Sequence, residues 1–266
     1  MKTMFVIKLA SVVCALVAST LAVAAPVSLT TGDKVKLLSS GGYGNAFGGG
    51  VFNAVGTSAL NGAQSFQTFC IEFSEHISYD RDFYVGSVTH ASTRGGVSGG
   101  IADPGLPNGV GDPISAQTAF LYTNFRNNTL TGFTANQAAS GNALQLAIWY
   151  LEEEIGSGGA FASSPYASSI TSAYSTYLGG AGVTTLAESF VALANAAVAE
   201  GGSWYGKGIG SVRALNLYAD SSYTQHAQDQ LYLQPIPEPE TYAMMLAGLG
   251  LVGFVAARRR RALLRS

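Results

Sequence analysis

The sequence predicts an α+β domain in which a β-rich scaffold carries a helical insert, with an addressing segment at each end. Three observations lead to this fold class. Between residues 29 and 89, runs rich in Val, Phe, Tyr and Thr alternate with clusters of Gly, Ser, Asn and Asp, as in successive strands and turns. Apolar residues then recur at helical spacing, and strand-like runs return after residue 211. Strands, then helices, then strands is the order of an α+β domain.

The first part of the domain is expected to be β-structure. Strands are predicted at residues 35–38, 50–55, 68–73 and 83–89, because each run is rich in β-branched or aromatic side chains. Residues 94–112 combine Gly, Pro and Asp, a composition that favours an exposed loop.

Helices are predicted in the second part. Asp112-Pro113 has the N-cap residue and the first-turn proline of a helix start. Within residues 142–155, four apolar residues at positions i, i+3, i+4 and i+7 form one face of a helix. Thr185 and Glu188 have the spacing of a capping box. A further helix and two closing strands are expected at residues 165–178, 212–218 and 230–234.

The charges divide the chain into three parts. Of 266 residues only 11% are charged, and the basic ones are concentrated at the two ends. Residues 25–235 hold 14 acidic and 7 basic side chains, a net charge of −7. This balance excludes nucleic-acid binding through clustered Lys and Arg. A hydrophobic content of 47% is sufficient for a packed core.

Residues 1–24 have the pattern of a secretory signal peptide. Lys2 and Lys8 supply a positive start, an apolar run follows, and Ala22-Val23-Ala24 is a small-residue cleavage site. The alternative is a membrane anchor, but the apolar run is short for one. The mature protein is therefore expected outside the cytoplasm.

Residues 236–261 form the other addressing segment. Pro237-Glu238-Pro239 precedes sixteen uncharged residues, 242–257, and then four consecutive arginines, Arg258, Arg259, Arg260 and Arg261. Sixteen helical residues span roughly 24 Å, slightly less than the ~30 Å hydrocarbon core. The arginines place the C-terminus in the cytoplasm by the positive-inside rule. A plain tail anchor is the simpler alternative.

This tripartite segment closely resembles the PEP-CTERM sorting signal of exopolysaccharide-producing Gram-negative bacteria. The resemblance implies that exosortase, a membrane-embedded cysteine protease, recognises the signal and cuts near Pro237-Glu238-Pro239. The protein would be anchored in the inner membrane before processing and would then reach the cell surface or the extracellular matrix.

Cys70 is the one cysteine left after removal of the signal peptide. An exported protein with one thiol cannot form an internal disulfide. The thiol is therefore buried and inert, paired with another chain, or used chemically. Its neighbours in Thr68–Phe73 are largely apolar, which is typical of a core position.

Gln145 is a polar residue beside the apolar face of the predicted helix at residues 142–155. It lies four residues before Trp149 and so on the same side of the helix. A glutamine in this position needs a hydrogen-bond partner. An ordinary bond to the backbone and a chemical role are both open at this point.

Together, Phe-Cys-Ile-Glu at residues 69–72 and Leu-Gln-x-Ala-Ile-Trp at residues 144–149 resemble the thioester domains of bacterial surface adhesins. Asp229-Gln230-Leu231 is similar to the closing strand of that group. The resemblance implies that Cys70 and Gln145 condense into an internal thioester, which an amine or hydroxyl of a polysaccharide or surface can then attack. Thiolate formation needs a lowered pKa or a nearby base.

Glu72 is the candidate proton shuttle for this chemistry. It shares a strand face with Cys70 if residues 68–73 form a strand. His76 and His90 are further candidate bases, although nothing in the spacing places them.

Two rival functions remain. The first is a non-covalent structural or adhesive protein of the matrix, in which Cys70 is inert. The second is a hydrolase that uses Ser98, since residues 96–100 match the Gly-x-Ser-x-Gly pattern. That pattern lacks the preceding apolar strand and the following helix, so we expect no enzyme activity. The three histidines show no metal spacing, and the sequence predicts neither a metal site nor a cofactor.

Overall fold

A computed structural model describes the parts of the chain that form the domain. These are residues 28–46, 49–59, 62–73, 75–93, 101–102, 110–155, 181–235 and 246–250. Several predicted features lie outside them: the signal peptide, the helix at residues 165–178, Ser98, the Pro237-Glu238-Pro239 motif and the four arginines from Arg258 to Arg261. Most of the apolar segment 242–257 also lies outside, while residues 246–250 are helical.

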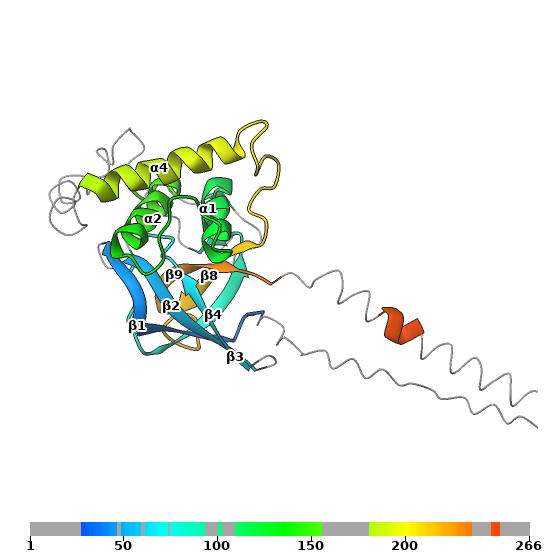
Figure 1. Ribbon diagram of the computed structural model, residues 1–266. Coiled ribbons are helices and arrows are strands. Elements are labelled where there is room, and N and C mark those ends of the chain that lie inside the picture. Colours follow the sequence, from blue (N-terminus) through cyan, green and yellow to red (C-terminus); the bar gives the residue numbers. More distant parts are fainter. Residues whose placement is uncertain are drawn as a thin grey trace, which may run out of the picture.

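One antiparallel sheet of six strands is the base of the domain (Figure 1). Its spatial order is β3-β2-β1-β4-β8-β9. The strands are β1 (Lys34–Ala46), β2 (Gly49–Ser58), β3 (Gly62–Thr68), β4 (Asp82–Thr89), β8 (Val212–Tyr218) and β9 (His226–Leu233). Alternating burial along β2 and β4 points one side chain in two toward the core.

The sheet curls until the segment after β3 pairs with β9, the strand at the opposite edge. The N–H of Leu231 donates to the Phe69 carbonyl at 3.0 Å, and the N–H of Ile71 donates to the Asp229 carbonyl at 3.1 Å. Between these bonds Cys70 forms an antiparallel bridge with Gln230. Pairing of the two edges satisfies backbone groups that an open sheet would leave exposed. Cys70 therefore lies at the closing seam of the sheet.

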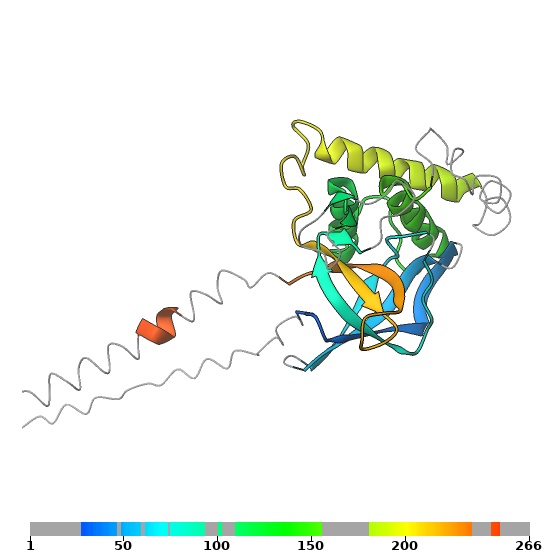
Figure 2. The same cartoon turned by 180° about the vertical axis from the view of Figure 1, so that it is seen from behind.

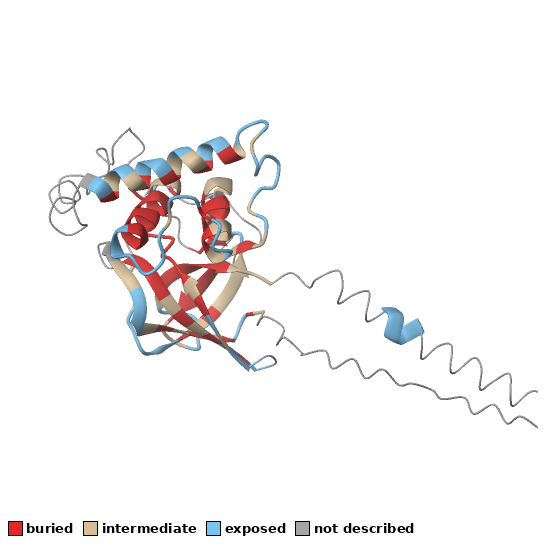
Figure 3. Cartoon of the chain, in the orientation of Figure 1, coloured by how far each residue is buried: buried red, intermediate tan, exposed pale blue. Residues whose placement is uncertain are grey.

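Three helices form a layer over one end of the curled sheet (Figures 1 and 2). They are α1 (Ala116–Arg126), α2 (Ala138–Leu151) and α4 (Ala181–Val198). Helix α2 contacts β1 and β2 on one side and α4 on the other. This position explains why residues 140–149 are all buried, whereas the outer face of α4 is exposed (Figure 3).

The part of the chain between β4 and α1 forms a small second sheet. It consists of β5 (Ala91–Ser92), β7 (Val110–Pro113) and β6 (Ile101–Ala102), in that spatial order. The expectation of an exposed loop over residues 94–112 is therefore wrong at the described residues 101–102 and 110–112, which pair as short strands. Backbone pairing across the loop overrides the turn-forming composition.

The largest correction concerns the strand predicted at residues 68–73. Strand β3 ends at Thr68, and Cys70 pairs only as an isolated bridge. The chain then leaves the sheet, because side chains take over as partners: Glu154 Oε2 accepts from the N–H of Phe73 at 2.9 Å. Glu72 is not in a strand, so the alternation argument that placed it on the same strand face as Cys70 is wrong.

The predicted helix starts are also shifted. Helix α1 begins after Ser115, whose hydroxyl accepts from the N–H of Thr118, while Asp112-Pro113 pairs in β7. Helix α2 starts and ends four residues earlier than expected, and α4 already includes Thr185 in its interior. At α1 the local capping signal was outweighed by the strand pairing of Asp112 and Pro113. The strand predicted at residues 212–218 matches β8, and the last strand is longer than expected.

Candidate functional site

The Gln145 side chain crosses from α2 to the seam of the sheet and binds the backbone of Cys70. Its Oε1 accepts the N–H of Cys70 at 3.1 Å, and its Nε2 donates to the Cys70 carbonyl at 2.9 Å. A second backbone donor, the N–H of Gly50, reaches the same Oε1 at 3.2 Å. Both Cys70 and Gln145 are fully buried. The structure therefore brings together the two residues that the motifs singled out.

Two glycines in β2 make this approach sterically feasible. A Cβ on Gly49 would lie 2.6 Å from Cη2 of Trp149 and 2.9 Å from Cγ of Gln145, closer than atoms of that kind pack. Gly50 has a φ of +141°, a backbone region that favours glycine. Helix α2 can rest against β2 here only because no side chain intervenes.

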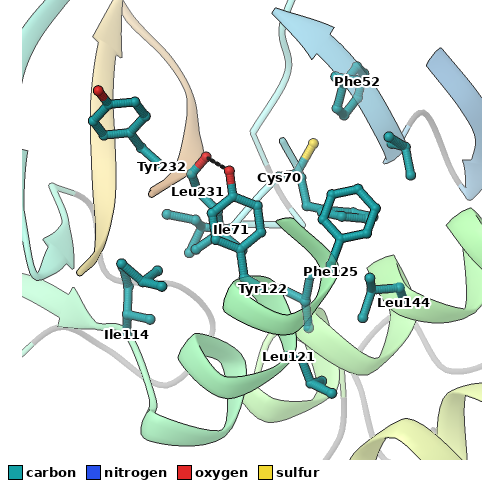
Figure 4. Close-up of a cluster of buried hydrophobic side chains, with 14 of the residues drawn as sticks. Phe52, Cys70, Ile71, Ile114, Leu121, Tyr122, Phe125, Leu144, Leu231 and Tyr232 are labelled. Atoms are coloured by element: carbon teal, nitrogen blue, oxygen red, sulfur yellow. Dashed lines mark hydrogen bonds between the residues drawn. The ribbon is translucent and has the colours of Figure 1, made fainter. Parts of the chain in front are cut away.

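The sulfur of Cys70 is held in an environment poor in water. In Figure 4 the Cys70 side chain points away from α1. Gln230 Nε2, from the paired position on β9, lies 3.8 Å from the sulfur and donates to it. Burial raises the pKa of the thiol strongly, and the Gln230 hydrogen bond offsets only part of this effect. The thiol is therefore protonated at neutral pH in the resting structure.

Three carboxyl groups gather beside this pair: Glu72, Glu75 and Asp229. One oxygen from each lies within 4.8 Å of the others. Glu72 is almost completely buried, and the side chains of Glu75 and Ser92 are close enough to interact with its carboxyl group. Burial, followed by the nearby charge of Asp229, raises the pKa of Glu72 far above its usual value. Glu72 is therefore a protonated acid at neutral pH.

Within this group of three carboxyl side chains, Asp229 accepts hydrogen bonds from backbone N–H groups on both of its oxygens. Its Oδ2 accepts from the N–H of Thr93 at 3.0 Å, and its Oδ1 accepts from the N–H of Leu217 at 2.9 Å. Burial nevertheless raises its pKa, and these bonds oppose that effect. The three side chains are the grouping within the described ranges that could hold a metal ion. Because both Asp229 oxygens already have backbone donors, we interpret Glu72 and Asp229 as a buried pair in which the charge of Asp229 disfavours ionisation of Glu72.

A cavity of about 380 Å³ opens beside these residues. Gly49 and Gly50 line one wall, and Glu75, His76 and Gln228 line another. At its edge Tyr79 is 49% exposed and its ring lies 5.9 Å from that of Phe52. Burial raises the pKa of Tyr79. Neither Cys70 nor Gln145 is among the lining residues, so the cavity adjoins the buried pair only through neighbours such as Gly50, whose N–H binds Gln145.

Aromatic rings shield the other side of the site. Trp149 is almost fully buried, and the ring of Phe73 meets it edge-on at 5.0 Å. Phe69, next to Cys70 in the chain, packs against Phe125, with 5.0 Å between the ring centres. A thioester in such a place would be protected from hydrolysis, since few water molecules reach it.

Sequence reasoning missed three participants: Gly50, Glu75 and the side chain of Gln230. The Asp229-Gln230-Leu231 motif was noted, and its alternation in β9 could have indicated that Gln230 and Gln228 share a face. Gly50 and Glu75 reach the site only because segments that are far apart in the sequence meet in the fold. His90 is not among the residues that line the cavity, whereas His76 is.

Comparison with known proteins identifies the C-terminal segment. Residues 235–261 match the model of the PEP-CTERM protein-sorting motif. No curated protein and no solved structure matches the chain. Of the helices in the described ranges, none combines the length and the apolarity needed to cross a bilayer.

The PEP-CTERM match assigns an address to the protein. It implies export, recognition by exosortase, and processing of a membrane-anchored form by this membrane protease. The matched residues include Pro237-Glu238-Pro239 and the arginines from Arg258 to Arg261. They are separate from the domain that contains Cys70 and Gln145, so the address does not explain the chemistry of the domain.

Proposed function

We propose that the exported domain attaches covalently to amines or hydroxyls at the cell surface or in the extracellular matrix, through an internal thioester between Cys70 and Gln145. The observation that carries this proposal is the double hydrogen bond between the Gln145 amide and the Cys70 backbone. It holds the amide carbon against the residue that bears the nucleophile. The event is a single attachment and not enzymatic turnover.

The backbone donors at Gln145 support the bond-forming step. When sulfur adds to the amide carbon, negative charge develops on Oε1. The N–H groups of Cys70 and Gly50 already point at this atom at 3.1 and 3.2 Å. Two such donors stabilise a tetrahedral intermediate in acyl-transfer enzymes, where the nucleophile's own N–H is one of them. The same arrangement is present here before reaction.

The proton balance assigns a role to Glu72. A sulfur–carbon bond forms, the carbon–nitrogen bond of the Gln145 amide breaks, and ammonia leaves with the thiol's proton. Because Glu72 is held as a neutral acid, it can donate a proton to the departing nitrogen and recover one from the thiol. An incoming amine or hydroxyl then forms an amide or ester with Gln145 and restores the Cys70 thiol.

Intact mass of the processed protein tests the thioester directly. Loss of ammonia should lower the mass about 17 Da below that of the sequence between its measured termini. Cys70→Ala should restore the full mass of its own sequence, and methylamine should add to the wild type with release of an alkylatable thiol. Full mass with a freely alkylated Cys70 in freshly prepared wild-type protein would contradict the proposal.

A substitution at Glu72 tests the proton shuttle separately. In Glu72→Gln the fraction of molecules with the lower mass should fall, because the neutral amide cannot donate and recover a proton. Glu188→Gln is the matched control, since this residue is exposed and lies on helix α4. Equal thioester content in both variants, with unchanged thermal stability, would remove Glu72 from the mechanism.

A non-covalent structural or adhesive role is the second candidate. The observation that favours it is that both polar atoms of the Gln145 amide have backbone partners, as an ordinary buried glutamine requires. On this alternative Cys70 is an inert core residue and the cavity binds its ligand reversibly. The mass measurement separates the two candidates.

A further inference from the structure

A second cleft, of about 720 Å³, lies between α1, the segment around Trp204 and strand β9. It shares no lining residue with the cavity near Cys70. Its volume falls in the range of small-molecule sites, about 300–1,000 Å³. The lining combines three kinds of group: aromatic rings, two cations and side-chain amides. The residues that carry the argument are Arg126, Trp204, Lys207, Phe66, Tyr232 and Gln234.

The two cations in this cleft are unusual for so acidic a domain. Arg126 and Lys207 are two of only seven basic residues in residues 25–235, and no acidic residue is among those that line the cleft in the described ranges. The ion pairs formed among the described residues lie outside the cleft, since both join Asp82 to a lysine, Lys34 or Lys36. The charges of Arg126 and Lys207 are thus available to a ligand.

Both cations are positioned by neutral groups. Arg126 donates to the carbonyl of Gln67 at 3.2 Å, and its guanidinium lies 5.9 Å from the Phe66 ring centre. Lys207 donates to the Ser203 carbonyl at 2.7 Å and lies 5.1 Å from the Trp204 ring centre. Contacts of this kind orient a cation and leave its charge uncompensated.

Trp204 supplies a fixed, partly exposed aromatic surface. Its indole N–H donates to the Gly208 carbonyl at 2.7 Å, and its ring meets Phe120 edge-on at 5.9 Å. A rigid aromatic ring offers an apolar contact at low entropic cost. Side-chain amides of Gln64, Asn127 and Gln234 on the same lining add donors and acceptors.

We propose that this cleft binds a carboxylated sugar unit of a polysaccharide. Such a unit has an apolar C–H face for Trp204, hydroxyls for the amides and a carboxylate for Arg126 or Lys207. A bidentate or charge-assisted contact from these cations selects an anionic sugar over a neutral one. Because the protein is exported, the cleft meets extracellular polymers and not cytoplasmic nucleotides. The proposal does not depend on the thioester.

The test is affinity electrophoresis of the processed protein in gels that contain polygalacturonate or neutral dextran. Polygalacturonate should retard the wild type and dextran should not. Lys207→Gln should weaken retention about tenfold, the effect of losing one charge-assisted contact. Trp204→Leu should weaken it as well. Lys36→Gln removes the same charge outside the cleft and should leave retention unchanged.

Three outcomes would overturn the assignment. The first is equal retention in dextran, and the second is an equal loss of retention in Lys207→Gln and Lys36→Gln. The third is full release of the protein by inorganic phosphate at a concentration equal to that of the galacturonate units that retain half of it. Melting temperatures of all variants exclude unfolding as the cause. Cys70→Ala should bind polygalacturonate like the wild type. Failure of the thioester therefore leaves this result intact, and the reverse also holds.

Discussion

The side-chain amide of Gln145 is bound at both ends by the main chain of a single residue, Cys70. The bond lengths are 3.1 Å from the Cys70 N–H and 2.9 Å to the Cys70 carbonyl. These residues are 75 positions apart in the chain. The contact ties helix α2 to the seam at which the sheet closes, so it is structural as well as a candidate for chemistry.

Removal of the Gln145 amide should destabilise the protein substantially. Gln145→Leu leaves the N–H groups of Cys70 and Gly50 and the Cys70 carbonyl without a partner in the core. Each unsatisfied buried group costs about 1–3 kcal/mol, so the free energy of unfolding should fall by about 3 kcal/mol or more. Urea denaturation measures it. Gln137→Leu is the control, because this N-cap glutamine makes no side-chain capping bond; an equal loss there would refute the assignment.

A methyl group at Gly49 should disturb the same contact. In Gly49→Ala the new Cβ must displace Trp149 or Gln145, since it would lie 2.6 and 2.9 Å from them. Overpacking of this kind costs about 1–3 kcal/mol, and thioester content should fall with it. Gly182→Ala is the matched control: its Cβ meets nothing within 4 Å, and alanine in helix α4 should stabilise by up to about 1 kcal/mol. Similar stability changes in the two variants would show that the approach at Gly49 is not tight.

Glu152 should make stability depend on pH between about 4.5 and 7. Burial raises the pKa of Glu152 from 4.5 to about 7, although hydrogen bonds from Thr118 and Ser115 oppose the shift. The folded protein therefore binds more protons than the unfolded chain in this window, and stability falls as pH rises through it. Above pH 7 both states are ionised, and this contribution levels off.

A substitution isolates this contribution. In Glu152→Gln the decline in stability between pH 5 and 7 should become shallower, by about 3 kcal/mol at most. Gln keeps one oxygen to accept the Ser115 hydroxyl bond, which Oε1 now accepts at 2.7 Å. Denaturation midpoints at pH 5, 6 and 7 measure the slope. A slope identical to that of the wild type would place the titrating group elsewhere.

The sorting segment should control processing without affecting the fold of the domain. Replacing Pro237, Glu238 and Pro239 by alanine should leave an unprocessed, membrane-bound form, because exosortase no longer recognises the chain. Cell fractionation with an antibody against the domain measures the distribution. Glu200→Ala, an exposed change within the domain, should be processed normally. Normal release of the triple-alanine variant would contradict the role of the motif.

Local sequence signals were sufficient for the address and for most strands. Charge and hydropathy alone indicate the sorting segment, since export machinery recognises short linear patterns, and the PEP-CTERM match bears this out. β-branched and aromatic runs located the start of β1, the body of β2 and nearly all of β4 and β8, because such side chains favour strands. The type of each described helix was also predicted, while its boundaries were displaced by tertiary contacts.

Residue chemistry also singled out Cys70, Gln145 and Glu72, but their surroundings arise only from folding. Closure of the sheet sets Cys70 beside Gln230, and packing of α2 on β2 brings Gln145 to Gly50. The gathering of Glu72, Glu75 and Asp229 needs the same closure. No local rule predicts these pairings, because they are long-range contacts whose free energy comes from burying apolar surface across the whole domain. The sequence by itself determines which residue types are present, whereas their distances and pKa shifts depend on which distant segments pack together.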